Sequence, residues 1–525
     1  MPMAKQYTNL GRVVSDTRNS VHCYRWRGDR RLAAKLKNEH ATGFTITLVE
    51  SPDVKPIGVG EGTWPTMRRT LKAMGIGETD FIQQCNVSFK QGAKFAKWVT
   101  GEEDDFYYHP LVLPQDFDRT NLARHWAYAP SGQSFSQAVS PQETVCELGL
   151  APKAITTAEY ASIINYAYHL DAGLFSAFLQ QHCTDKLGVR HILDNVSHIN
   201  SALNGDITSV STAQNGDIKG DLFIDCTGFK SLLLGEHFKV GFKSCKDVLF
   251  VDQALAIHVP YDDENAPVAS HTISTGQSAG WVWDIGLQNR RGVGHVYSSA
   301  HTSEERAGEE LLHYIRQTGG SVNSADIRKI PLNPGHREKF WQRNCVAIGL
   351  SAGFLEPLEA SSLLLVEISA SMIAEQFPAM RDAMDVIAKR FNRTFLYRWE
   401  RIIDFLKLHY MLTQRNDSDF WIDNRDPVTI PQSLQDHLTL WRYQPPWHND
   451  FEDAVEVFPA ASYQYVLYGM GFYTQHSALG LSDAYQQKAV SLRHKNSQQC
   501  EQMRRNLPTN RALLNKIHQY GLQKV

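Results

Sequence analysis

Residues 31–50 have the sequence RLAAKLKNEHATGFTITLVE, a helix-compatible segment followed by a strand pattern. Residues 44–50 alternate apolar and polar side chains, which indicates a strand, and residues 31–40 suit a helix that precedes it. A helix followed by such a strand forms half of a βαβ unit. The segment therefore predicts an α/β fold.

Two further segments have the composition of strands in the same kind of sheet. Residues 221–228, DLFIDCTG, and residues 345–350, CVAIGL, are short apolar runs that end in small residues. This composition is typical of buried parallel strands that lead into tight turns. We expect both turns to lie close to a bound cofactor.

The chain after residue 375 is expected to be mainly helical. Apolar residues recur in steps of three or four from Met384 onward, at Ile387, Phe391, Phe395, Trp399, Ile402 and Leu406. This spacing marks one face of a long helix. Residues 486–505 are more polar and predict a surface helix that stops near Pro508. The expected division is a core at residues 1–375, which includes the sheet that faces the substrate, and a helical region at residues 376–525.

Composition excludes several classes of protein. The 525 residues are 42% hydrophobic and 21% charged, as in ordinary globular proteins, and the net charge of -3 offers no basic surface for nucleic acid or an anionic membrane. The eight cysteines form no CxxC pair, which argues against a metal site and against a disulfide scaffold. No apolar run approaches the roughly 20 residues of a membrane span, and no signal peptide is evident. We expect a cytoplasmic protein.

The turn that should bind a dinucleotide phosphate is missing. Such folds begin with a strand, a GxGxxG turn and a helix, and an acidic residue about 20 positions later binds the ribose. Glu50, at the end of its strand, is the candidate acid. The expected glycines are replaced by residues 23–32, CYRWRGDRRL, whose four arginines would keep the backbone away from a pyrophosphate.

A shifted reading frame would explain this stretch. If the codons of residues 23–32 are TGT TAT CGG TGG CGG GGG GAC CGC CGG CTG, followed by G, reading one base later gives VIGGGGTAGW. That sequence is a flavin-binding fingerprint with one extra glycine. We hypothesise that residues up to about Leu32 are read in a shifted frame and that the proper frame resumes at Ala33. The alternative is a different N-terminus that binds no phosphate.

Four motifs carry a resemblance to a known family. They are GVGEGTWP at residues 58–65, Phe89-Lys90 with KFAKW at 94–98, GWVWDIG at 280–286 and FLEPLEASS at 354–362. Their order and spacing resemble those of the flavin-dependent tryptophan halogenases, from about Ala33 to beyond Gly471. The resemblance implies an FAD-binding core like that of the flavin monooxygenases that hydroxylate aromatics, with a helical C-terminal region that builds the substrate pocket.

The resemblance assigns catalytic roles to Lys90 and Glu359. Lys90 would receive hypohalous acid made at a flavin hydroperoxide, as a haloamine or a hydrogen-bonded acid, and deliver electrophilic halogen. A desolvated amine suits this role because it is nucleophilic when neutral and a hydrogen-bond donor when protonated. Glu359 would take the ring proton or orient the halogen donor, since a carboxylate stabilises a cationic ring intermediate. Lys94 and Lys97 are expected at the surface, and Glu356 is expected to be structural.

The resemblance also assigns the cofactor and halide contacts. The FAD contacts would be Glu50, Gly60, Thr63, Val196, Leu350 and Leu363, with the two leucines beside the isoalloxazine and the valine at the adenine end. Free backbone N–H groups at the start of the helix after Glu359 form an anion site. Ser361 and Ser362 would hold chloride or bromide there. The family has Ser-Thr-Gly where this chain has Ala360-Ser361-Ser362, so the preference between the halides stays open.

Trp281 and Trp283 belong to a motif that distinguishes this family from flavin hydroxylases. In the family, the bulky pair is thought to impede direct oxygenation of a substrate near the flavin. The bland alternative is one buried and one packed aromatic residue. Gly286 replaces the proline with which the motif normally ends.

Three residues are assigned to the substrate: His109, Leu111 and Tyr463. The segment FYYHPL at 106–111 resembles the one whose histidine and aromatic partner sandwich indole, but Leu111 stands in place of the aromatic. A histidine that is only packed and hydrogen-bonded is the alternative for His109. Residues 462–469, SYQYVLYG, lack the paired tyrosines and acidic cluster that hold the amino acid of free tryptophan. We expect an indole-like substrate, either a small indole derivative or an aromatic carried by a larger molecule, in place of free tryptophan.

The predicted function is FADH2-dependent halogenation of an indole-like aromatic, with FADH2 supplied by a separate NADH-dependent flavin reductase. One alternative is a flavin monooxygenase that hydroxylates an aromatic and needs no halide. Another is a non-catalytic remnant that no longer binds FAD because its phosphate loop is altered.

The frame-shift hypothesis predicts the nucleotide sequence of the gene. We expect the codons of residues 23–32 to encode the glycine-rich fingerprint when they are read one base later, and we expect the two frames to meet at Ala33. Sequencing the gene across this stretch is the measurement. Codons that cannot give the fingerprint in the alternative frame remove the hypothesis.

Overall fold

The computed structural model describes residues 19–24, 44–54, 60–128, 132–452, 456–475 and 480–524. The helix expected at residues 31–40 lies outside these ranges. So does most of the arginine-containing stretch on which the frame-shift hypothesis depends. These two predictions are therefore not addressed by the fold.

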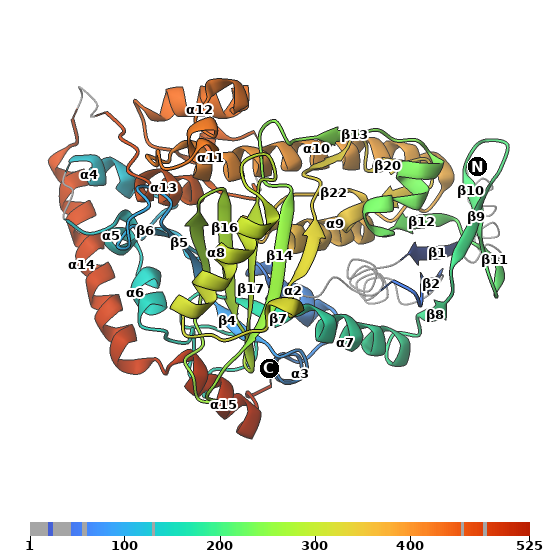
Figure 1. Ribbon diagram of the computed structural model, residues 1–525, viewed down its shortest axis with the longest axis horizontal. Coiled ribbons are helices and arrows are strands. Elements are labelled where there is room, and N and C mark those ends of the chain that lie inside the picture. The colour runs from blue at the N-terminus through green and yellow to red at the C-terminus, as the bar shows by residue number, and fades with distance from the viewer. Residues whose placement is uncertain are drawn as a thin grey trace, which may run out of the picture.

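A six-stranded sheet forms the end of the molecule on the right of Figure 1. Its strands, in spatial order, are β20 (Trp341–Gln342), β21 (Cys345–Ala347), β12 (Leu222–Asp225), β1 (Asn19–Tyr24), β2 (Phe44–Glu50) and β8 (Arg190–Leu193). All pairs from β21 to β8 are parallel, so their carboxyl ends meet at one edge. The strands predicted near residues 44–50, 221–228 and 345–350 are confirmed.

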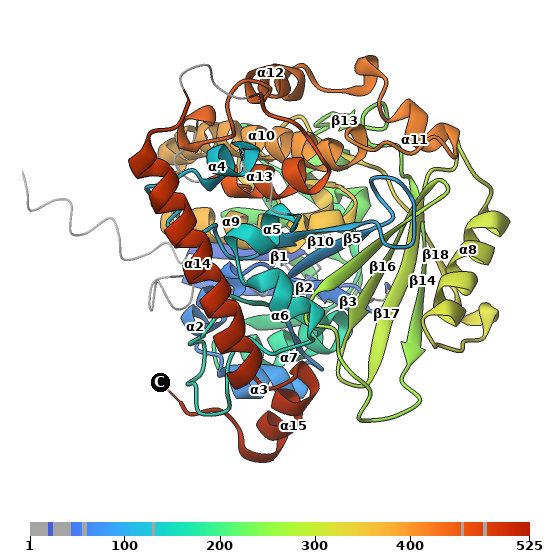
Figure 2. The ribbon, with the colours of Figure 1, turned by 90° about the vertical axis from the view of Figure 1, so that its left-hand side faces the viewer.

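A seven-stranded sheet forms the middle of the molecule (Figure 1). Its order is β18 (Arg328–Pro331), β14 (Gln253–Pro260), β17 (Arg290–Tyr297), β16 (Gly280–Gly286), β15 (Thr272–Gln277), β5 (Gly92–Ala96) and β6 (Phe106–Pro110). Alternate side chains of each strand point to opposite faces. Leu255, Val282 and Val293 pack against helix α8 (Glu304–Gln317), which covers the outer face in Figure 2, whereas Trp283 and Val296 point inward to a cavity.

A small antiparallel sheet positions Lys90, which is the last residue of one of its strands. It contains β3 (Gly60–Gly62), β7 (Ala167–Asp171) and β4 (Ser88–Lys90). A fully buried ionic cluster lies beside it, in which Glu78 accepts hydrogen bonds from Lys153 Nζ at 2.6 Å, Tyr166 OH at 2.6 Å and Tyr168 OH at 2.7 Å. Tyr168 is paired with Phe89 across β7 and β4. The cluster therefore fixes the strand that ends at Lys90.

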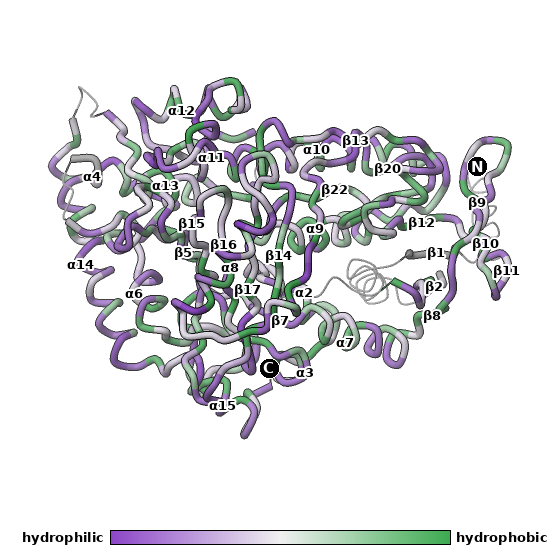
Figure 3. The backbone as a smooth tube through the Cα atoms, viewed as in Figure 1, coloured by the Kyte–Doolittle hydropathy of each residue, from purple (hydrophilic) through white to green (hydrophobic). Residues whose placement is uncertain are grey.

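Among the described residues, the region after residue 375 is helical, as expected. Its helices are α10 (Arg381–Met411), α11 (Asp419–Asp423), α12 (Gln432–Trp441), α13 (Ala460–Gly469), α14 (Asp483–Asn506) and α15 (Asn510–Tyr520). α10 buries the predicted apolar face, and α14 is a polar surface helix that ends before Pro508 (Figure 3). No helix in the described part of the chain is long and apolar enough to cross a membrane.

Shorter elements complete the core. They are α2 (Thr66–Ala73), α3 (Glu78–Gln84), α4 (Leu122–Tyr128), α5 (Phe135–Val139), α6 (Gln142–Glu147), α7 (Ala172–Asp185), α9 (Ser361–Glu375), the sheet β9 (Val196–Ser201), β10 (Ile207–Thr212) and β11 (Gly216–Lys219), and the sheet β13 (Phe242–Ser244), β19 (Gly335–Arg337) and β22 (Gly353–Phe354). α9 is buried around most of its circumference, which agrees with its mainly apolar sequence.

Gly294 on β17 is predicted to be essential for the packing of the seven-stranded sheet. A Cβ at this position would overlap the indole ring of Trp283 and lie 2.6 Å from the carbonyl oxygen of Leu255. We expect Gly294→Ala to lower the free energy of unfolding by about 1–3 kcal/mol, as overpacking does. Chemical denaturation measures it. Gly308→Ala in α8 is the control. A Cβ at this position would have its nearest neighbour, the side chain of Leu255, at 3.9 Å, and alanine should stabilise the helix. Equal stability of the two variants would contradict this packing.

Candidate active site

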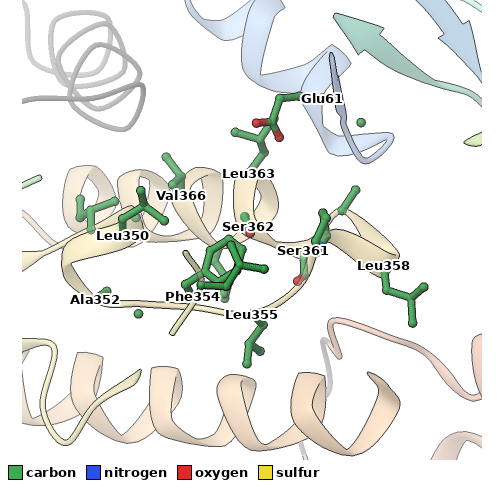
Figure 4. Close-up of a pocket in the computed structure, with 18 of the residues that line it drawn as sticks. Glu61, Leu350, Ala352, Phe354, Leu355, Leu358, Ser361, Ser362, Leu363 and Val366 are labelled. Atoms are coloured by element: carbon green, nitrogen blue, oxygen red, sulfur yellow. The ribbon is translucent and has the colours of Figure 1, made fainter. Parts of the chain in front are cut away.

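A cavity that is partly open to solvent lies between the two large sheets. The turns after β12 and β21 form one wall, α9 and α10 form another, and β16 closes the inner side. Predicted site residues that line it are Gly60, Lys90, Leu350, Ser361, Ser362 and Leu363. Figure 4 shows the last four of these around the cavity. One cavity therefore joins the positions assigned to flavin, halide and the reactive amine.

The cavity fits the ring system of a flavin. Leu350, Phe354, Leu363 and Val366 give it apolar walls, which suit a flat aromatic group (Figure 4). It also lies outside the carboxyl ends of parallel strands, where α/β folds bind dinucleotides. Glu50 stands at the end of β2, the position that contacts a ribose in such folds, and its Oε2 lies 3.1 Å from His191 Nε2.

Thr63 differs from its predicted role as a direct cofactor contact. Its side chain is fully buried, and its hydroxyl accepts a hydrogen bond from the backbone N–H of Tyr168 at 2.9 Å. Its own N–H donates to the carbonyl of Tyr168 at 2.8 Å. Thr63 thus attaches the loop after β3 to β7 and does not line the cavity. Val196 begins β9, also outside the cavity lining, so its assignment to the adenine end stays a prediction.

The halide position coincides with the start of α9. Ser361 and Ser362 begin this helix and line the cavity, and no described side chain caps its N-terminus. Ala360, the preceding residue, has a left-handed backbone with φ of 54°. This turn directs Glu359 away from the cavity while the first N–H groups of α9 stay beside it. Free N–H groups at a helix N-terminus favour an anion.

Lys90 is buried at the end of β4 and lines the cavity. Its Nζ lies 3.3 Å from where a Cβ on Gly62 would stand, so a larger residue at position 62 would crowd the amine. Burial lowers the pKa of Lys90 to about 8, although the nearby carboxylate of Glu359 acts to raise it. A useful fraction of the amine is therefore neutral near pH 7. Lys94 and Lys97, by contrast, pair with Glu147 and Glu103 near the surface, as predicted.

Glu359 is buried and held by two histidines. His109 Nδ1 lies 2.8 Å and His409 Nε2 lies 3.2 Å from the same oxygen, Oε1. Trp64 Nε1 donates to the Glu359 carbonyl at 2.9 Å. Burial acts to raise the pKa of Glu359, but the charges and hydrogen bonds of His109 and His409 outweigh this and lower the pKa to about 2. The carboxylate therefore stays charged.

Each histidine is oriented by a hydroxyl that sequence analysis did not identify. Ser462 Oγ lies 2.9 Å from His109 Nε2, and Tyr107 OH lies 2.7 Å from His409 Nδ1. His409 belongs to α10, and Ser462 belongs to α13, in the segment 462–469 that was quoted only for the tyrosines and acidic residues it lacks. Helical periodicity marks such residues only as inward-facing, so nothing in their local sequence indicated a functional role.

A second, smaller pocket lies beside His109. Its lining is mainly apolar and includes Trp64, Leu111 and Tyr465, with Ser462 and His109 as polar members. Among the described residues, no lysine, arginine, aspartate or glutamate lines it. His109 and Leu111 thus line the same pocket, and their assignment to the substrate stays a prediction.

Tyr463 is placed differently from its predicted substrate role. Its ring packs against Phe405, Phe451 and Trp441 in the protein core. Tyr465 is the tyrosine that lines the small pocket. The two residues are two positions apart in α13, and side chains at that spacing point to different sides of a helix.

The two tryptophans of β16 have separate environments. Trp283 lines the cavity, whereas Trp281 is fully buried and donates its Nε1–H to Glu356 Oε2 at 2.8 Å. Tyr410 OH donates to the same oxygen. Burial raises the pKa of Glu356 to about 7. Glu356 lies behind the cavity wall in this network, in agreement with its expected structural role.

Comparisons with known proteins match this arrangement. The family model for tryptophan halogenase matches residues 31–485. The chain belongs to the tryptophan halogenase family. It is 30% identical to tryptophan 6-halogenase SttH of Streptomyces toxytricini, over 84% of this chain and 86% of that protein. It is also 30% identical to tryptophan 7-halogenase RebH of Lentzea aerocolonigenes, over 76% of each chain.

Solved structures agree. A tryptophan halogenase from Shewanella frigidimarina NCIMB 400 has a TM-score of 0.94 and 48% identity, covering 97% of this chain and 99% of that one. BrvH, a flavin-dependent halogenase from Brevundimonas sp. BAL3, has a TM-score of 0.83 and 30% identity, covering 95% and 99%. The protein is thus a flavin-dependent halogenase, an oxidoreductase that halogenates an aromatic. Neither the hydroxylase nor the non-catalytic alternative is favoured by these matches. The family match begins at residue 31, and the shifted frame stays a prediction.

The charge of Glu359 is predicted to control the pKa of Lys90. The carboxylate raises this pKa against burial, so its removal should lower the pKa below about 8. We expect Glu359→Gln to shift the titration of Lys90 to lower pH, measured by NMR of isotope-labelled lysine side chains. Glu147→Gln is the control, because Glu147 pairs with Lys94 instead. An unchanged Lys90 titration in Glu359→Gln would show that the two side chains do not interact.

Proposed function

We propose that this halogenase delivers electrophilic halogen from Lys90 to a neutral indole-like substrate in the small pocket beside His109. The observation that carries the proposal is the buried amine of Lys90, which lines the large cavity and interacts with the carboxylate of Glu359. Halide would be oxidised in the large cavity, and the small pocket would hold the aromatic substrate. Lys90 and Glu359 belong to the boundary between them.

FAD would occupy the large cavity, with Leu350 and Leu363 beside its ring system, Gly60 beneath it and Glu50 at its ribose. When bound in its reduced form, FAD supplies the electrons with which oxygen converts halide to hypohalous acid. Chloride or bromide would bind the free N–H groups of Ser361 and Ser362 at the start of α9. An NADH-dependent flavin reductase is the expected source of FADH2.

Lys90 would receive the halogen, as a haloamine or by hydrogen-bonding hypohalous acid. The low pKa of the amine, about 8, supports both roles, because neutral and protonated forms coexist near neutral pH. Burial excludes water, which would otherwise consume the oxidant. Glu359 would stabilise the cationic ring that forms when the halogen is transferred.

The lining of the small pocket supports a neutral substrate. A free amino acid carries an ammonium and a carboxylate, and burial of either without a partner is costly. Among the described residues of this pocket, none offers an opposite charge. Indole or an indole derivative without a charged side chain therefore fits better than free tryptophan.

The test compares Lys90→Met with the matched control Lys94→Met. The proteins receive FADH2 from a reductase, oxygen, bromide or chloride, and indole, and products are identified by mass spectrometry. We expect haloindole from the wild type and from Lys94→Met, and a loss of at least about 100-fold in Lys90→Met, because the delivering group is absent. FAD titration checks that each variant still binds the cofactor. Hydroxylated indole formed without halide, or full haloindole yield from Lys90→Met, would contradict the proposal.

A further inference from the structure

The side chains that face the substrate pocket are His109 and Ser462, and Glu359 lies behind them. His109 and Ser462 line the small pocket, whereas Glu359 lines neither described cavity. Ser462 Oγ, the imidazole of His109 and Glu359 Oε1 form a continuous hydrogen-bonded chain with contacts of 2.9 and 2.8 Å. All three residues are buried. This is the order hydroxyl, imidazole and carboxylate in which a histidine acts as a base.

We propose that His109 is the base that takes the ring proton of the aromatic substrate, and that Ser462 is a positioning residue that orients its imidazole. The proposal rests on the proposed function, because it assumes that the small pocket holds the arene. The carboxylate of Glu359 accepts the Nδ1–H of His109, which leaves the lone pair of Nε2 directed at Ser462 and the pocket. Before the reaction, His109 Nε2 accepts a hydrogen bond from the Ser462 hydroxyl.

The proton balance of halogenation supports a base at this place. When the ring forms its bond to halogen, the bond between halogen and the donor atom at Lys90 breaks, and that atom is left one proton short. The ring C–H bond then breaks, its electron pair restores aromaticity, and the proton moves to His109 Nε2. Glu359 stabilises the resulting imidazolium and lies beside Lys90, so the proton can return to the donor atom. No additional oxidant or reductant is needed.

Glu359 itself is poorly suited to collect this proton directly. Its Oε1 is already shared by His109 and His409, at 2.8 and 3.2 Å. Glu359 also lines neither described cavity, whereas His109 lines the small pocket, so the histidine is the group that can reach the ring proton. A base works best when its pKa lies near the operating pH, as that of an imidazole does. Glu359 therefore orients His109 and stabilises its protonated form.

His409 is a second positioning residue. Burial lowers its pKa, so the ring is neutral at neutral pH and carries a single N–H. Tyr107 OH contacts its Nδ1 at 2.7 Å, and its Nε2 lies 3.2 Å from Glu359 Oε1. The carboxylate is thus held from two sides, by His109 on β6 and by His409 on α10. Its second contact keeps Oε1 in place while His109 gains and loses a proton.

The test uses His109→Asn, whose amide nitrogen can replace Nδ1 as a donor to Glu359 but cannot act as a base. Turnover is measured separately on indole and on ring-deuterated indole. The wild type should show no isotope effect, because proton loss to a placed base is fast. In His109→Asn we expect turnover to fall by about 100-fold or more and a primary isotope effect to appear. His271→Asn is the matched control, because this buried histidine contacts Tyr108 and not the pocket.

Ser462 provides a second test should His109→Asn lose FAD binding. Ser462→Ala removes the hydroxyl that orients Nε2, and we expect a primary isotope effect to appear, which Ser462→Thr should abolish by restoring a hydroxyl. Halogenation by His109→Asn or Ser462→Ala without any isotope effect overturns the role of His109. Failure of the wild type to halogenate indole with either halide would instead overturn the proposed function, so the two failures are distinguishable.

Discussion

The buried negative charge of Glu359 is the constraint on which the site depends. Its side chain is only 4% exposed, and an unpaired carboxylate at such a depth costs several kcal/mol. Partners from three separate elements offset this cost: Lys90 from β4, His109 from β6 and His409 from α10. The fold must therefore bring a small sheet, the edge of the seven-stranded sheet and the long C-terminal helix to one point. The left-handed turn at Ala360, which directs Glu359 away from the large cavity, completes the arrangement.

The carboxylate of Glu359 lies between two spaces of different chemical character. On one side lies the large cavity with Lys90 and the start of α9, and on the other lies the small apolar pocket with His109. Trp64 lines the small pocket and donates to the carbonyl of Glu359, so it closes part of the boundary. Under the proposed function, an oxidant made in the first space would reach an arene in the second through the residues between them. The carboxylate also acts on the amine at this boundary, because it raises the pKa of Lys90 against burial.

Sequence predicted those parts of the molecule whose signal is local. Strand periodicity located Phe44–Glu50, helical periodicity located the buried face of α10, and contiguous motifs placed Lys90 and Leu363 at the large cavity. The roles of Thr63 and Tyr463 differ because neighbours within a motif can point in different directions: Thr63 bonds to β7, and Tyr463 turns into the core. His109 and Glu359 are 250 residues apart, and such a contact has no local signal. The same reason kept Ser462, His409 and Tyr107 from being predicted.

The geometry of α13 separates the choice of substrate from the chemistry. Ser462 contacts His109, whereas the hydroxyl of Tyr465, which lines the same pocket, donates to the carbonyl of Val112. Leu111 faces the same pocket from the segment after β6. Changes at Leu111 or Tyr465 can therefore alter the size and polarity of the pocket without moving Glu359, because neither residue holds the carboxylate. The described lining of this pocket can therefore change in size or polarity independently of the residues that contact Glu359.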